Sequence, residues 1–286
     1  MNLLDQISAA PMALRDMAAL AFLFVAWLGI GWFTERPPAG RPSVSVLMTR
    51  YRREWMRHFV ERDPRIFDGN ILASLREGTA FFASACMIAT GGLLALIGNG
   101  ERLRSVASGL ELTPTAGTGW ELRLLVPMFF VVNAFLKFVW AHRLFGYCAV
   151  MMAAVPNRAD HPETMDRAMQ AADLNITAAR SFNAGLRSVY FALGALGWLT
   201  GAWTLMLGTA IVLWVTWRRE FASTSRQVIL RSLPAPMLPT VASSAAGFSG
   251  IIGPMKPASP GGISAPASSS SSAGCERSTR RNSSRS

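Results

Sequence analysis

The chain has 286 residues, of which 51% are hydrophobic and only 16% are charged, and its formal net charge is +11. Soluble domains usually carry about 25% charged residues, so this composition argues against a soluble protein and predicts several membrane spans. The positive charge is no sign of nucleic-acid binding, because most arginines flank apolar runs or lie in a polar tail. We expect membrane lipids, with anionic headgroups, as partners and no nucleic acid.

The first apolar run, residues 17–33, is just long enough to span a bilayer. No basic region or small-residue cleavage site of a signal peptide accompanies it, so we expect an uncleaved helix. Residues 34–78 hold nine arginines and six acids. Within them an apolar stripe recurs every three or four residues, which predicts an amphipathic helix: Val44, Leu47, Tyr51, Trp55 and Phe59. This helix either lies on an anionic membrane surface or packs against the spans in the cytoplasm, and both interpretations stay open.

Two further spans are predicted over residues 79–97 and 122–140. The first is rich in small residues that let helices approach closely: Ala80, Ala83, Ser84, Ala85, Ala89, Gly91 and Gly92. The apolar pattern of the second continues through residues 144–155, which predicts either a long protruding helix or a kinked interfacial piece. A new helix is expected after residues 160–163.

The stretch from Ser188 to Trp217 has no charged residue. As one helix it would extend ~45 Å, against a hydrocarbon core of ~30 Å. A turn at Thr200–Gly201 would divide it into two short spans, residues 182–199 and 203–220. We favour this five-span arrangement over the four-span alternative.

The distribution of arginine supports that choice and sets the orientation. The loop over residues 34–78 is the richest in arginine and is expected to be cytoplasmic, which places the N-terminus outside. The loop over residues 99–121 has two arginines and three glutamates and is expected outside. Five spans then bring Arg218, Arg219 and the C-terminus into the cytoplasm, as the positive-inside rule requires.

The predicted fold class is therefore all-α: a polytopic transmembrane helical bundle with amphipathic cytoplasmic helices, over residues 1–231. Residues 232–286 are dominated by Ser, Pro, Ala and Gly. Such a composition buries too little apolar surface to offset chain entropy, so a disordered C-terminal tail is expected. A multi-pass location in a membrane is predicted.

Basic and polar residues mark the cytoplasmic boundary of the third and fourth spans. The candidates for contact with an anion or a lipid headgroup are Asn133, Lys137, Arg143, Tyr147, Arg180 and Arg187. The competing interpretation is interfacial anchoring, since membrane boundaries are generally rich in Lys, Arg, Trp and Tyr. Three histidines and three cysteines are scattered along the chain, so no catalytic residue, metal site or cofactor is predicted.

Five segments in order along the chain carry a family resemblance: RDPRIFDGNIL, FFASACMIATGGLLALIG, LKFVWAHRLFGYC, SFNAGLRSVYFALGALGWLTGAW and WRREF. Together they resemble family 599 of the domains of unknown function, integral membrane proteins of bacteria, over about residues 15–230. Similar sequences often read Gly-Pro-Trp where this chain has Gly-Ala-Trp at residues 201–203. The resemblance implies a membrane protein, located in the bacterial inner membrane, and carries over no activity, ligand or site residue.

Three functions remain in competition. The favoured one is a non-enzymatic helical bundle with a structural or accessory role, and self-association into a homo-oligomer stays open. The second is a small transporter or channel for an anionic solute, using the basic boundary residues. The third is a lipid-headgroup enzyme, for which only the isolated His142 lies near the boundary.

Overall fold

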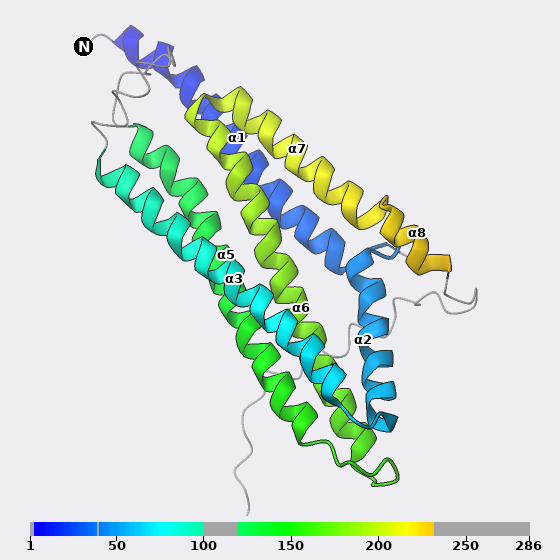
Figure 1. Cartoon of the computed structure of the whole chain (residues 1–286). Coiled ribbons are helices and arrows are strands. Elements are labelled where there is room, and N and C mark those ends of the chain that lie inside the picture. The colour runs from blue at the N-terminus through cyan, green and yellow to red at the C-terminus, as the bar shows by residue number, and fades with distance from the viewer. Residues whose placement is uncertain (1–2, 39, 100–118, 232–286) are drawn as a thin grey trace, which may run out of the picture. The chain divides into compact units, whose positions relative to one another are not determined.

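The computed structural model describes residues 3–38, 40–99 and 119–231, and within them every regular element is a helix (Figure 1). The first of two compact units, Met1–Thr240, contains all of these residues, and the second, Val241–Ser286, lies outside them. The predicted disordered tail and most of the loop after the second span are thus outside the described residues. The helices are α1 (Leu3–Glu35), α2 (Val44–Glu61), α3 (Ile66–Gly98), α5 (Gly119–Ala153), α6 (Thr164–Ala195), the 3-10 helix η1 (Leu196–Leu199), α7 (Ala202–Phe221) and α8 (Thr224–Arg231).

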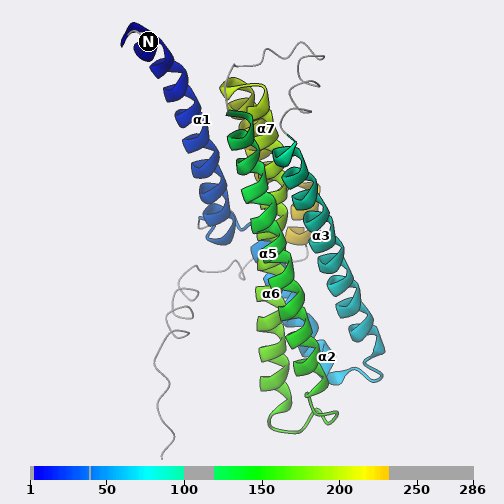
Figure 2. The ribbon, with the colours of Figure 1, turned by 90° about the vertical axis from the view of Figure 1, so that its left-hand side faces the viewer.

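The antiparallel pair of α5 and α6 forms the most extensive helix contact, and both views show the two helices side by side (Figures 1 and 2). Its close approach depends on Gly185, where an added Cβ would lie 2.7 Å from the ring of Phe138. On either side of this pair, α3 packs on α5, while α7 packs on α6 and α1 packs on α7. The α6 helix therefore links the two halves of the bundle.

The break predicted at Thr200–Gly201 is confirmed. The α6 helix tightens into η1, and Gly201 follows with φ +142°, a backbone conformation that L side chains rarely adopt. The chain then reverses into α7, which returns along α6. Small residues allow this contact, since a Cβ at Gly197 would lie 2.8 Å from the Thr204 carbonyl oxygen and one at Gly208 would lie 2.9 Å from that of Gly194.

The α2 helix packs along the N-terminal half of α6 and runs antiparallel to it. Its predicted apolar stripe explains this position, because Leu47 and Phe59 are buried there. Across the contact, the Arg53 guanidinium lies 3.1 Å from the Asp173 carboxylate. The structure therefore supports the second interpretation of this segment, in which the helix packs against the other helices.

Two apolar cores follow one another along the α5/α6 pair. The first joins α1, α3, α5, α6, η1 and α7 around the fully buried rings of Phe130, Phe138 and Phe191. The second joins α2, α3, α5 and α6 around Met56, Phe145 and the alanines of early α6. We call this second part the helical extension. It exists because α5 continues unbroken to Ala153, which settles the choice between a long helix and a kinked piece.

Three described helices contain stretches long and apolar enough to cross a membrane: Leu14–Glu35, Ile66–Gly98 and Leu122–Ala153. The predicted fourth and fifth spans, residues 182–199 and 203–220, are not among them. Arg180 and Arg187 interrupt α6, and α7 reaches Arg218 after a short uncharged part. The described residues are thus all-helical with three membrane-spanning candidates, and the five-span count stays a prediction.

Replacing Gly208 by Ala should destabilise the α6/α7 contact, because the new Cβ would press on the Gly194 backbone. Overpacking of this kind costs about 1–3 kcal/mol. Thermal unfolding in detergent, followed by tryptophan fluorescence, measures the loss. Gly92→Ala in α3 is the matched control, since a Cβ there meets no atom within 4 Å. Equal midpoints for the two variants would contradict the close contact.

Candidate functional site

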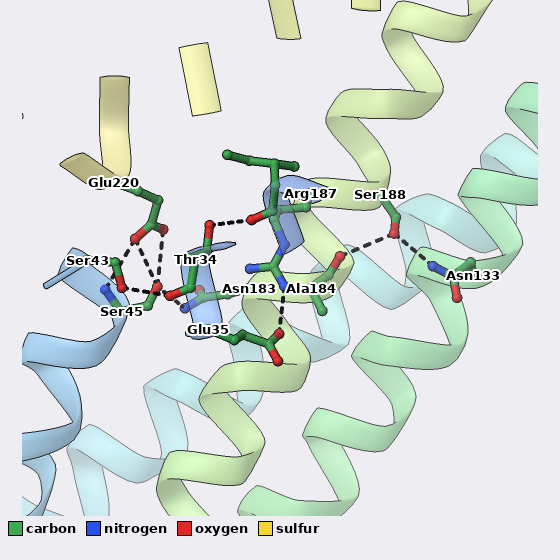
Figure 3. Close-up of polar contacts among 11 residues, drawn as sticks. Thr34, Glu35, Ser43, Ser45, Asn133, Asn183, Ala184, Arg187, Ser188 and Glu220 are labelled. Atoms are coloured by element: carbon green, nitrogen blue, oxygen red, sulfur yellow. Dashed lines mark hydrogen bonds and ion pairs between the residues drawn. The ribbon is translucent and has the colours of Figure 1, made fainter. Parts of the chain in front are cut away.

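Polar side chains gather where α1 ends, α2 begins and α7 ends (Figure 3). The chain turns sharply between α1 and α2, and Ser43 holds this turn. Its Oγ donates to the Thr34 carbonyl oxygen at 2.8 Å and accepts from the Val46 backbone N–H at 3.2 Å. Ser43 is therefore the N-cap of α2 and also ties this helix to the last turn of α1.

The centre of this cluster is an ion pair between α6 and α1. Arg187 Nη2 donates to Glu35 Oε1 at 2.9 Å. The Arg187 side chain is only 10% exposed, whereas that of Glu35 is 49% exposed. The guanidinium thus extends from a buried position in α6 to a carboxylate at the open end of α1. Burying a charge without a partner is expensive, so Glu35 makes the position of Arg187 tolerable.

The third member is Glu220, near the end of α7, which faces the first turn of α2. Its carboxylate accepts from the Ser45 backbone N–H at 3.2 Å, and the Ser45 hydroxyl lies 3.1 Å from both carboxylate oxygens. A negative charge at a helix N-terminus is favourable, because the first backbone N–H groups have no partner within the helix. Asn183 of α6 adds a weaker contact, 3.4 Å to the Ser45 hydroxyl. Four helices, α1, α2, α6 and α7, therefore meet through these polar side chains.

One predicted site residue, Asn133, is used inside the α5/α6 pair. Its Nδ2 donates to Ser188 Oγ at 2.8 Å, and this hydroxyl donates in turn to the Ala184 carbonyl oxygen at 3.2 Å. Ser188 is buried. This contact is an interhelical hydrogen bond of the kind that holds membrane helices together.

The other predicted site residues lie on exposed surface. Arg143 stacks near Tyr147, with 6.0 Å between its guanidinium carbon and the ring centroid. Lys137 and Arg180 are also exposed. Among the described residues, no hydrogen bond or ion pair joins Lys137, Arg143 or Arg180 to Arg187. The structure therefore gives Arg187 an internal partner, and a shared anion site stays a prediction.

Sequence reasoning missed the acidic partners, Glu35 and Glu220. The sequence did offer a signal. Each of the two glutamates follows an apolar run, at the end of that run where arginines are found. A charge such as Arg187, five residues after the start of the predicted span 182–199, demands an opposite charge on a neighbouring span. Choosing among the acids, however, requires knowing that α1 and α7 both pack beside α6.

A second polar contact lies on α1 at the other end of its apolar stretch, Leu14–Glu35. The Trp198 ring nitrogen donates to Asp16 Oδ1 at 2.9 Å, and Arg123 lies 4.0 Å from the other carboxylate oxygen. The Arg123 guanidinium also lies over the Trp198 ring, at 5.8 Å. This contact joins α1, α5 and η1, so polar side chains hold both ends of the apolar stretch of α1.

Within the helical extension, charged side chains close the corners between helices. Asp68, fully buried in α3, accepts from the Trp55 ring nitrogen at 2.6 Å and pairs with Arg62. Arg65 Nη1 donates to the Val155 carbonyl oxygen at 3.0 Å and so ties the α2–α3 corner to the end of α5. Partial burial of Arg52 in α2 lowers the pKa of its guanidinium. Each of these groups has a structural partner. In the part of the chain that the structure describes, no group of three or more His, Cys, Asp or Glu side chains is placed to hold a metal ion.

Comparison with known proteins gives one match. The family model described as "Protein of unknown function, DUF599" matches residues 18–225, which is most of the chain and nearly the range of the resemblance noted in the sequence. No curated protein and no solved structure matches significantly. The matched range begins within α1 and ends within α8, and the match brings no ligand or catalytic residue.

Replacing Glu35 by Ala should destabilise the bundle by about 1–3 kcal/mol, because it leaves the buried guanidinium of Arg187 unpaired. The half-exposed position of Glu35 favours the lower part of that range. The double variant Glu35→Ala/Arg187→Leu should lose less than the sum of the two single variants, since the pair is removed together. Denaturant titration in mixed micelles measures these differences, and the exposed Arg180→Ala serves as the control. Strict additivity in the double variant would argue against the ion pair.

Proposed function

The chain belongs to the DUF599 family of proteins of unknown function, and we propose that it is a non-enzymatic, multi-pass protein of the bacterial inner membrane with a structural or accessory role. The observation that carries this proposal is the use of its polar side chains. Arg187, Glu35, Glu220 and Asn133 all bond to neighbouring helices. A pore or an active site needs polar groups directed at a solute, whereas these groups hold the helices together.

We further propose five spans, with the N-terminus outside and the C-terminus in the cytoplasm. The packing supports this topology, because the arginine-rich segments before α3 and after α5 meet in one helical extension. The two ends of the α6–α7 hairpin also carry different residue types, as this topology predicts. Trp198 lies at the turn with Asp16, and Arg219 lies at the far end against Tyr190.

The two polar contacts on α1 have a separation that suits a bilayer. Asp16 and Glu35 lie 19 residues apart on one helix, roughly 28 Å at ~1.5 Å per residue. The hydrocarbon core of a bilayer is ~30 Å thick. Ion pairs at both boundaries therefore leave an apolar segment of matching length between them, which supports one full crossing by α1.

Anionic lipid headgroups are the partners that we propose for the exposed basic residues Lys137, Arg143 and Arg180. Their long side chains reach from the helix surface toward the headgroup level, where anionic lipids attract positive charge. Arg187 is not part of this surface, because its guanidinium pairs with Glu35. The proposal is therefore headgroup binding by the outer face of α5 and α6.

The topology is tested by labelling single cysteines in whole cells with a membrane-impermeant maleimide. In a chain whose three cysteines are replaced, Thr200→Cys should be labelled from outside. Asp160→Cys, in the α5–α6 loop, should be labelled only after permeabilisation. Thr200 suits the label better than Gly201, whose φ of +142° disfavours any side chain. Thr200→Cys that reacts only in permeabilised cells, together with external labelling after Arg231, would contradict the five-span topology.

Headgroup binding is tested in liposomes and by native mass spectrometry. Lys137→Gln/Arg180→Gln should retain less phosphatidylglycerol than the parent chain, because two cations at the headgroup level are lost. Arg57→Gln/Arg158→Gln removes the same charge from the helical extension and should retain as much as the parent. The liposomes should show no chloride or phosphate flux. A flux that disappears in Lys137→Gln would favour the anion transporter over the structural role.

A further inference from the structure

The α3 helix is the edge of the bundle. Of the other helices, α5 alone makes an extensive contact with it. Only 6% of its most apolar stretch is buried inside the chain, compared with 28% for α1 and 33% for α5. Both views show α3 against α5 with its far side open (Figures 1 and 2). A complete face of this helix is therefore available to something outside the chain.

One line on the open face combines three small residues with the larger Met87 and Leu94. The exposed residues of this line recur every three or four positions: Ala80, Ser84, Met87, Gly91 and Leu94. A Cβ at Gly91 would meet no atom within 4 Å. Glycine inside a helix costs about 0.5–1 kcal/mol relative to alanine, so Gly91 is unfavourable for the isolated chain. In α6 and α7, by contrast, Gly185, Gly194 and Gly208 each face a close neighbour that accounts for them.

Two opposite charges flank this line at the boundary of the apolar stretch. Arg76 and Glu77 are both exposed, and their side chains make no ion pair or hydrogen bond within the described residues. Successive residues are about 100° apart around a helix, so the two side chains lie on either side of the line through Ala80 and Ser84. In a single copy these two exposed charges are met only by water and lipid headgroups.

We propose that α3 forms a parallel homodimer, in which the line through Ala80, Ser84 and Gly91 meets the same line of a second copy. This inference rests on the membrane insertion in the proposed function, which gives every copy the same orientation. A two-fold axis along the membrane normal then brings equal residue numbers to equal depth. Arg76 of each copy faces Glu77 of the other, so the interface has two identical ion pairs.

A second copy suits this face better than lipid does, because of the small residues and because of the two charges. Small residues permit close backbone approach between helices, which is what drives helix association in membranes. The charge pattern is complementary to itself only in a symmetric, parallel pair. A helix with like charges on both flanks would repel its own copy.

Disulfide cross-linking in native membranes tests the interface. The starting chain has Cys86→Ala, Cys148→Ala and Cys275→Ser. Ser84→Cys should form a disulfide-linked dimer on mild oxidation, because the two Cβ atoms must come within about 4.5 Å for this bond. Ala85→Cys is the matched control, since it is equally exposed at the same depth but faces about 100° away. It should stay monomeric.

A charge exchange tests the ion pairs independently. Glu77→Arg and Arg76→Glu should each reduce the dimer fraction measured by light scattering in detergent, and the double variant should restore it. Cross-linking at Ala85 and not at Ser84, or a monomer in light scattering, would overturn the proposal. Membrane insertion is read separately, as resistance of the protein to alkaline extraction. A monomer that resists extraction contradicts the dimer alone, whereas an extractable protein contradicts the proposed function.

Discussion

A guanidinium enclosed by apolar helices is the constraint on which the arrangement of this bundle depends. Arg187 lies seven residues beyond Arg180 along α6. Two fully buried rings lie in the same helix pair: Phe191 in α6 and Phe138 in α5. The charge of Arg187 requires a partner, and Glu35 at the end of α1 supplies it at 2.9 Å. The pair sets how far α1 extends along α6. The turn to α2 follows directly, and Ser43 and Glu220 hold it.

The second constraint is backbone proximity in the α6–α7 hairpin. The uncharged stretches on either side of the turn, residues 188–199 and 202–217, are short for a bilayer, and α6 carries polar groups, so apolar length alone does not hold the two helices in place. Close packing at Gly194, Gly197 and Gly208 replaces side-chain bulk with backbone contact. In lipid, such contact is a principal source of helix association, because there is no hydrophobic drive between apolar surfaces. Close packing at glycines thus holds the hairpin in the bundle, whereas ion pairs hold α1.

Much of the fold was predictable from the sequence, because apolar periodicity and length report directly on helices. The break at Gly201 followed from a run too long for a bilayer, and the amphipathic character of α2 followed from its stripe. The place of α2 was not predictable. A basic helix with an aromatic face suits a membrane surface and a helix groove equally well, and the groove exists only because α5 and α6 both continue beyond the apolar stretch. For the candidate site, the arginines were visible as charges out of place, but Glu35 and Glu220 became partners only through packing.

Because of the helical extension, α6 is the helix that joins the two apolar cores to one set of neighbours after another. Along its length α6 contacts α5 throughout, α2 in its first half, and α1 and α7 in its second half. Both cores therefore share one continuous helix, and Arg187 lies between them. The extension is connected to the rest of the bundle in two ways. The first is α6 itself, and the second is the turn before α2, where Ser43 bonds to Thr34 and Ser45 bonds to Glu220. A contact made at the extension therefore reaches the rest of the bundle along one continuous helix, which is what the structural or accessory role that we propose requires.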